Sequence, residues 1–343
     1  MRRGWKLIGW SIGAISLYIF FTYFFDFVET KRLLAEARIF PVFLCLLSFL
    51  TAIVLRSVKW TFILKIKNRV RWRDGYHTVM ISNLINYFFP IRLGEVAKLY
   101  LINRAADISY SSSVSAVLLD RFSQLFMTLA FLIFIPLTGF KLFHSSLNMT
   151  TIIFIVIFIL LLLSLFFYGT SLLFILQRIG KKVLVFCGVD EERIDAIFRG
   201  RIARFFEETM GKIDLYGYAK RDLFVILFFS WVIIWLDGAC YYFLLHAFGI
   251  SISQLETALG ACLMNLMFIL PTPPGQVGTA EMYPVIIFSW GFGISSVKIS
   301  LTAVLWHLLS TAVFLVLGIC SLSFLDMRLG ALFQNIRKKE IDS

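Results

Sequence analysis

The chain has 343 residues, of which 59% are hydrophobic, 17% aromatic and 16% charged, and its mean hydropathy is +0.84. Soluble domains are nearer half apolar and about a quarter charged, so this composition excludes an ordinary soluble protein and indicates a polytopic membrane protein. The net charge of +12 is typical of basic inside loops and contact with anionic lipid, and we expect no nucleic-acid partner.

A membrane span requires ~20 consecutive apolar residues. Two apolar regions, about 77–103 and 256–291, are interrupted by Pro, Gly and charge, and we expect them to be re-entrant hairpins. The sequence therefore predicts an all-α polytopic membrane protein, a single membrane domain over 1–343, with two re-entrant hairpins related by an inverted repeat and six full transmembrane helices at about 5–25, 41–64, 112–138, 149–176, 222–248 and 298–325.

Basic residues predict the orientation, because Lys and Arg concentrate in cytoplasmic loops. With the N-terminus inside, the basic stretches at 65–73 and 178–221 and the C-terminal tail all lie inside. We therefore expect both termini in the cytoplasm. The polar segment at about 177–221 has amphipathic-helical spacing, and we expect it to lie on the inner membrane face.

The first interruption reads "NYFFPIRLGEVAK", from Asn86 to Lys98. Broken helices survive in a bilayer only where they are buried in protein or line a wet cavity. Pro90 ends a helix and is also favourable in a first helical turn. This stretch therefore predicts two half-helices, 77–89 and 92–103, joined by a turn.

The second interruption, "NLMFILPTPPGQVGTAE" from Asn265 to Glu281, repeats the order Asn, Pro, Gly, Glu. Paired Gly/Pro-interrupted segments in the two halves of a chain are typical of inverted-repeat transporters, whose tips lie near the bilayer midplane. The predicted tips place two helix N-termini there, which attract anions such as phosphate.

Arg92 adds a full positive charge at the first tip, and Gly94, Gly275 and Gly278 allow a headgroup to approach the backbone. Glu95 and Glu281 stand in first helical turns. Each is either a helix cap or a protonatable, substrate-gating carboxylate, and the sequence leaves both roles open.

Other charges lie within the predicted spans and are functional candidates by default. We expect Arg121 to bind phosphate together with Arg56, and Asp120 to orient Arg92 or Arg56. Lys59 is expected to snorkel to the inner surface. Structural contacts or packing are expected for Asp237, His246 and His307.

Three stretches, "NYFFPIRLGE", "SSVSAVLLDRFSQLF" and "PTPPGQVGTAE", resemble signatures of the lysylphosphatidylglycerol synthase transmembrane region family, also called flippase-like proteins. The resemblance covers about residues 5–325. One departure is Pro274-Gly275-Gln276, where the family usually has Pro-Gly-Gly, so a side chain enters the tip. The substrate-binding residues that we expect are Asn86, Arg92, Gly94, Glu95, Arg56, Asp120, Arg121, Pro274, Gly275, Gly278 and Glu281.

No catalytic residues, metal ligands or cofactor site are expected, because no CxxC, nucleotide loop or catalytic triad is present. The preferred hypothesis is a transporter, not an enzyme, that moves a phosphate-bearing lipid between leaflets of a prokaryotic cell membrane. Two alternatives stay open: an enzyme or accessory subunit in lipid modification or lipid-linked glycan synthesis, and a lipid-binding scaffold. Homo-oligomerisation or a partner lipid-modifying enzyme also stays open.

Overall fold

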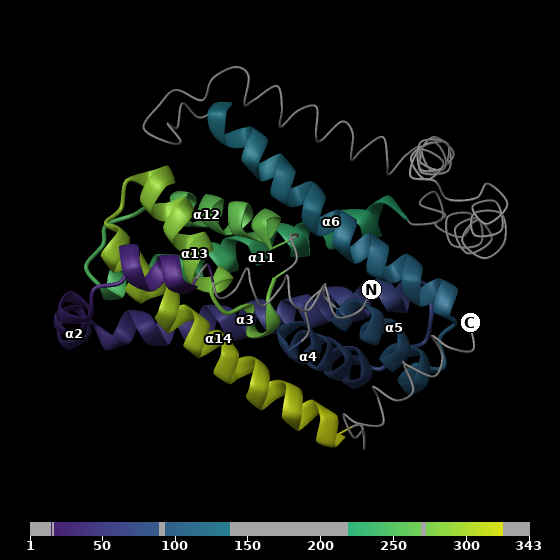
Figure 1. Cartoon of the computed structure of the whole chain (residues 1–343). Coiled ribbons are helices and arrows are strands. Elements are labelled where there is room, and N and C mark those ends of the chain that lie inside the picture. Colours follow the sequence, from purple (N-terminus) through teal and green to yellow (C-terminus); the bar gives the residue numbers. More distant parts are fainter. Residues whose placement is uncertain (1–14, 16, 89–92, 138–218, 269–271, 325–343) are drawn as a thin grey trace, which may run out of the picture.

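The computed structural model describes residues 15, 17–88, 93–137, 219–268 and 272–324. Every regular element in these residues is a helix (Figure 1). Two are π-helices, η1 (Phe20–Phe24) and η6 (Val285–Gly291), and one is a short 3-10 helix, η5 (Pro274–Gln276). The α-helices are α2 (Phe27–Ala35), α3 (Ile39–Lys67), α4 (Trp72–Phe88), α5 (Leu93–Ala106), α6 (Tyr110–Leu137), α11 (Lys220–Ala247), α12 (Gln254–Met267), α13 (Thr279–Pro284) and α14 (Ser296–Phe324).

Four helices in the described part of the chain are long and apolar enough to cross a membrane, which makes the protein an integral membrane protein. They lie at Ile39–Lys67, Ser112–Leu132, Lys220–Ala247 and Ser296–Phe324, where spans were predicted. The predicted span 149–176 and nearly all of the 177–221 segment lie outside the described residues. Of the predicted span 5–25, the structure describes the second part, which includes η1.

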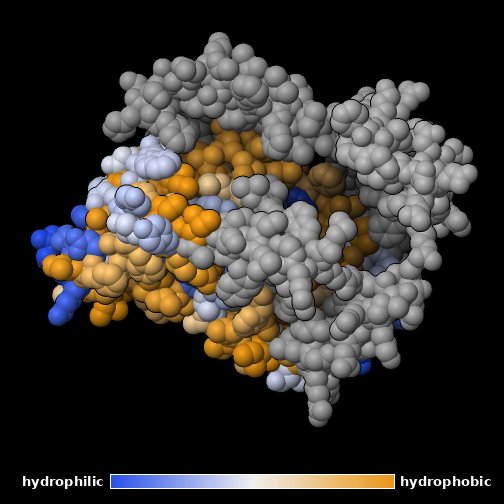
Figure 2. All heavy atoms as spheres, viewed as in Figure 1, coloured by the Kyte–Doolittle hydropathy of each residue, from blue (hydrophilic) through white to orange (hydrophobic). Residues whose placement is uncertain are grey.

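Large hydrophobic side chains are exposed along one face of the long helices, at the three- and four-residue spacing of a helical stripe. On α11 this stripe contains Phe224, Phe228 and Trp231. Hydrophobic residues also cover most of the coloured face in Figure 2, while hydrophilic residues gather at the end where α2 lies. These stripes are suited to contact with lipid tails.

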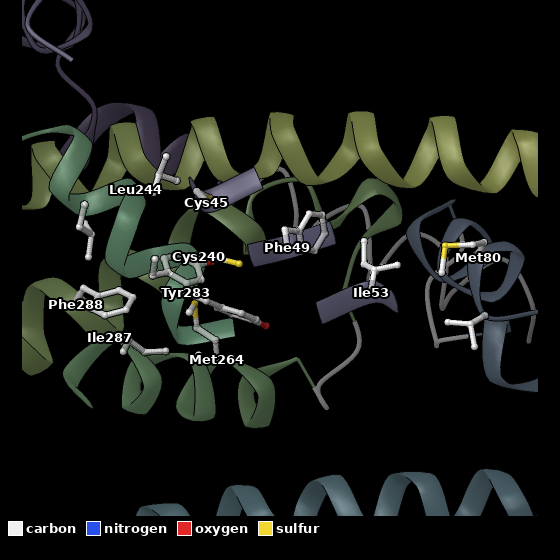
Figure 3. Packing of buried hydrophobic residues seen from close by; sticks show 14 of the residues in the cluster. Cys45, Phe49, Ile53, Met80, Cys240, Leu244, Met264, Tyr283, Ile287 and Phe288 are labelled. Carbon is white, nitrogen blue, oxygen red and sulfur yellow. The ribbon is translucent and has the colours of Figure 1, made fainter. Parts of the chain in front are cut away.

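The core lies between α3 and α11, which pack against each other, with α12, α13 and α14 closing around them (Figures 1 and 3). Small residues allow the close approach that helices in membranes use. A Cβ added at Gly238 of α11 would lie 2.5 Å from Cα of Ala258 in α12. The buried cluster in Figure 3 includes Cys45, Phe49, Ile53, Met80, Cys240, Leu244, Met264 and Tyr283.

The first interrupted region forms two helices that pack side by side, α4 and α5. The Ser82 hydroxyl donates to the carbonyl of Gly94 at 2.7 Å, and the Gly94 N–H donates to Oδ1 of Asn86 at 2.7 Å. A Cβ on Gly94 would lie 2.1 Å from the Ser82 carbonyl oxygen. Glycine is therefore required where α5 begins against α4. The two predicted half-helices are present as α4 and α5, whereas the turn predicted between them, with Pro90 and Arg92, lies outside the described residues.

The second interrupted region is more fragmented than the predicted hairpin. After α12 the chain forms η5, turns at Gly278, and continues as α13 and η6. Gly275, Gln276 and Gly278 have φ angles of 70°, 56° and 83°. This left-handed region suits glycine, so Gln276 adopts a conformation that is uncommon for a residue with a side chain. The departure from Pro-Gly-Gly thus changes the side chain at the tip while the backbone keeps a glycine-like shape.

We predict that Gly238→Ala destabilises the protein by ~1–3 kcal/mol, because the new methyl group meets the backbone of α12, which cannot rotate away as a side chain can. Alanine is otherwise favoured over glycine in helices by about 1 kcal/mol. Helix propensity alone would therefore make Gly238→Ala stabilising, the opposite of the expected result. Thermal unfolding in detergent measures the change. Ser323→Ala on the exposed side of α14 is the control and should leave the unfolding midpoint unchanged. A stabilised Gly238→Ala variant would contradict the close packing of α11 on α12.

Candidate functional site

Five charged side chains form a continuous cluster where α3, α5 and α6 meet. Lys59 Nζ lies 3.1 Å from Oδ1 of Asp120, and Lys98 Nζ lies 3.3 Å from Oδ2 of the same carboxylate. Lys98 Nζ is also 4.0 Å from Oε2 of Glu95, whose Oε1 accepts a hydrogen bond from Arg121. The charges alternate from Lys59 to Arg121, so the cluster, which we call the α3–α5–α6 ion cluster, has a net charge of +1.

The α3–α5–α6 ion cluster runs from the protein interior to its surface. The side chain of Lys59 is 2% exposed and that of Lys98 is 5% exposed, whereas that of Arg121 is 47% exposed. The one half-exposed member is therefore a cation. A ligand that reaches this site from outside meets a guanidinium group, and a negatively charged ligand is the complementary one.

Neighbouring groups hold the α3–α5–α6 ion cluster in place. The ammonium of Lys98 lies 4.1 Å from the centre of the Trp60 ring, a cation–π contact. The amide of Asn86 donates to Glu95 at 3.5 Å, which connects the cluster to the start of α5. Oδ1 of Asn86 also accepts the N–H of Gly94. The one side chain of Asn86 therefore supports both the start of α5 and the carboxylate of Glu95.

The expected role of Lys59 was wrong, and so was one of the two partners expected for Asp120. Asp120 was predicted to orient Arg92 or Arg56; it lies between Lys59 and Lys98, Arg56 has another partner, and Arg92 lies outside the described residues. Lys59 was predicted to snorkel to the surface, but it is buried, because a carboxylate on α6 neutralises it inside the bundle. Lys98 was not predicted, although its spacing of three residues from Glu95 is a helical ion-pair signal.

Arg56 of α3 forms a separate ion pair with Asp237 of α11. One terminal nitrogen of Arg56 lies 2.6 Å from each carboxylate oxygen. Asp237 was predicted to make a structural contact, and the structure gives it Arg56 as the partner. Arg56 and Lys59 are three residues apart, ~4.5 Å along the helix axis, so this pair and the α3–α5–α6 ion cluster are neighbours along α3.

The second polar site lies at the tip of the second interrupted region. Glu281 accepts the N–H of Gly278 through Oε2 at 2.7 Å, and its Oε1 lies 2.5 Å from Nδ1 of His307 on α14. His307 Nε2 lies 2.8 Å from the carbonyl oxygen of Gly275. Glu281 therefore caps α13 and also contacts a titratable residue, so it has more than the capping role. Pro274 begins the short helix η5 that carries Gly275.

Tyr87 of α4 connects this tip to the first interrupted region. Its hydroxyl lies 2.6 Å from Nε2 of His307 and 2.5 Å from Oγ1 of Thr311. His307 was expected to pack or lie at the interface, but it contacts both interrupted regions. Sequence reasoning missed its role because no motif marks the position.

The structure thus divides the predicted site residues into three groups. The first group lies at the start of α5 with Lys59 and Lys98, and it contains Asn86, Gly94, Glu95, Asp120 and Arg121. The second group lies around His307, and it contains Gly275, Gly278 and Glu281. Arg56 joins neither group and pairs with Asp237. Arg92 lies outside the described residues, and in the described part of the chain no group of three His, Cys, Asp or Glu side chains is placed to hold a metal.

We predict that Asp120→Asn destabilises the protein by about 3–5 kcal/mol, because it leaves Lys59 and Lys98 without a shared carboxylate inside the bundle. Glu29→Gln removes a carboxylate from an exposed ion pair with Arg32 and should cost at most ~1 kcal/mol. Unfolding midpoints in detergent compare the two. Equal shifts would contradict the burial of the α3–α5–α6 ion cluster.

We also predict that Arg56→Met and Asp237→Leu are each more destabilising alone than together. Each single change leaves one charge without a partner, whereas the double change leaves none. A double-mutant cycle on unfolding free energies measures this coupling. Additive single and double effects would show that the two side chains do not depend on each other.

The arrangement can be compared with known proteins. No curated protein sequence matches the chain. The family model of the lysylphosphatidylglycerol synthase TM region matches residues 7–318, which include both interrupted regions and both polar sites. With a match over more than half of its length, the chain belongs to the lysylphosphatidylglycerol synthase transmembrane region family, whose description links it to membrane lipid.

Proposed function

We propose that the protein translocates a phosphate-bearing anionic lipid, either a phospholipid or a polyprenyl-phosphate-linked lipid, between the leaflets of the membrane. The observation that carries this proposal is the α3–α5–α6 ion cluster, which has a net charge of +1 and ends at the half-exposed Arg121. Family membership supports a substrate related to membrane lipid.

Arg121 already holds an anion of the protein itself, the carboxylate of Glu95. Carboxylate and phosphate oxygens bind guanidinium in the same way, so a lipid phosphate can replace Glu95 at Arg121 during transport. Glu95 would then keep Lys98 as its partner, because the two are one helical turn apart on α5. In this mechanism Glu95 occupies the anion site when no lipid is present.

The transport proposal includes the architecture expected from the sequence. The two interrupted regions would act as re-entrant hairpins in an inverted repeat with six full spans and cytoplasmic termini, in a prokaryotic cell membrane. The side-by-side packing of α4 and α5 and the positive φ angles at Gly275 and Gly278 support this arrangement. Headgroups would cross at the hairpin tips while the acyl or prenyl chains stay in the bilayer.

We predict that Arg121→Ala reduces the movement of labelled phosphatidylglycerol at least ~10-fold, since a hydrogen bond to a charged group contributes about 1.5–3 kcal/mol. The assay uses purified protein in liposomes and measures the lipid accessible to a membrane-impermeant quencher. Arg32→Ala is the matched control, because Arg32 also pairs with a glutamate but lies on the exposed helix α2. That control should move lipid at the wild-type rate.

Loss of Arg121 alone leaves Glu95 without its nearest cation, so folding needs a separate test. The double variant Glu95→Gln/Arg121→Gln removes both charges of the pair and should fold but still fail to move lipid. Arg92→Ala is expected to behave like Arg121→Ala, and Arg92→Lys should be partly active, because lysine lacks the forked donors of arginine. Wild-type lipid movement by an Arg92/Arg121 neutral variant would contradict the proposal.

The same assay separates the competing functions. An enzyme or accessory subunit of lipid modification would give a chemically altered lipid or require a partner. A lipid-binding scaffold would retain the phosphatidylglycerol without moving it between leaflets. Either result with folded wild-type protein would replace the transport proposal.

A further inference from the structure

The hydrogen bonds around His307 fix where each proton lies. Thr311 Oγ1 lies 2.5 Å from the backbone carbonyl oxygen of His307, and a carbonyl can only accept, so the threonine hydroxyl donates to it. The hydroxyl of Tyr87 lies 2.5 Å from the same Thr311 oxygen. Because the threonine proton is already used, Tyr87 must donate to Thr311.

His307 Nε2 faces two acceptors. One is the carbonyl oxygen of Gly275 at 2.8 Å, and the other is the hydroxyl oxygen of Tyr87 at 2.6 Å, whose own proton points to Thr311. If Nε2 had no proton, its lone pair would face the lone pairs of both oxygens, which is repulsive. Nε2 therefore carries a proton.

The other ring nitrogen, Nδ1, lies 2.5 Å from Oε1 of Glu281. If His307 were neutral, with its proton on Nε2, Nδ1 would present a lone pair to the lone pairs of an ionised carboxylate. Such a contact is repulsive at this distance. One further proton must lie between the two atoms, carried either by the imidazole or by the carboxyl group.

We propose that Glu281 and His307 together form a binding site for one proton, and that this proton fastens the tip of the second interrupted region to α14 and, through Tyr87, to α4. When the proton leaves, the contact becomes repulsive and the tip is released. The proton is bound at low pH and lost as the pH rises. The link to lipid movement rests on the proposed function, but the proton site itself does not.

The surroundings make the pair a local unit. The side chains of Glu281 and His307 are only 10% and 12% exposed. Tyr87 is the titratable group that faces them from α4. From α12, Glu256 is engaged in capping its own helix at Ser253, and on α13 Tyr283 packs against Phe268. Oε2 of Glu281 is held by the N–H of Gly278, so a change at Oε1 acts directly on the backbone of the tip.

The test measures how easily the tip opens, without measuring lipid movement. Val277, which is 37% exposed at the tip, is replaced by cysteine in a background carrying Cys187→Ser and Cys320→Ser. The rate of maleimide labelling is followed across mildly acidic to mildly alkaline pH in detergent. A Cys187→Ser protein that keeps the exposed Cys320 and has no Val277→Cys corrects for the ionisation of the thiol itself.

After that correction, we expect labelling of Val277→Cys to increase about tenfold with rising pH, the change that ~1.4 kcal/mol of lost contact produces. Glu281→Gln should be slow to label at every pH. Its amide N–H₂ can donate to Nδ1 while its oxygen accepts from Gly278, so the contact persists without a titrating proton. Glu281→Ala should label fast at every pH, because it lacks both contacts.

Tyr87→Phe is the matched control, since it removes the link to α4 but leaves the proton between Glu281 and His307. This variant should keep the pH response. The proposal is overturned if Glu281→Gln responds to pH as the parent does, if Glu281→Ala labels slowly, or if Tyr87→Phe loses the response. A pH-responsive tip in a protein that moves no lipid in liposomes would instead leave the proton site standing and remove the proposed function.

Discussion

Ionised side chains inside an apolar bundle constrain every helix that carries them, because an unpaired charge there costs several kcal/mol. Lys59, Lys98 and Arg121 come from three helices and all meet carboxylates from their neighbours. These contacts fix how α3, α5 and α6 are rotated and how far each is shifted along its axis. The pair of Arg56 and Asp237 does the same for α11 against α3. Apolar packing then fills the space that this charge pairing defines.

The two interrupted regions are held by different chemistry. At the first, the cations are lysine and arginine, and each carboxylate lies between two of them. At the second, the contacts depend on the carboxyl, imidazole and hydroxyl groups of Glu281, His307 and Tyr87, and at least one of them requires an exchangeable proton. The proposed anion site and the proposed releasable tip thus lie on the same α4–α5 and α13–α14 framework.

Elements with a local signal were predictable from sequence. Four spans appear where long apolar runs predicted them, and the second interrupted region is broken at its Pro and Gly cluster, because both signals depend only on neighbouring residues. Charge partners were not predictable. Arg56 and Lys59 are three residues apart, yet one faces α11 and the other α6. Which helix lies beside which residue depends on the packing of the whole bundle. His307 was missed for the same reason, since only the folded chain brings Glu281 and Tyr87 to it.

The ion pairs of α3 also bear on how the protein is made. Arg56 and Lys59 leave the ribosome early, but Asp120 follows Lys59 by 61 residues and Asp237 follows Arg56 by 181 residues. When α3 enters the membrane, neither cation has its carboxylate. A lone arginine or lysine at the centre of a helix adds about 2.5–3.5 kcal/mol to the insertion free energy. Insertion of α3 therefore carries this cost until α6, and later α11, brings the carboxylates that neutralise it.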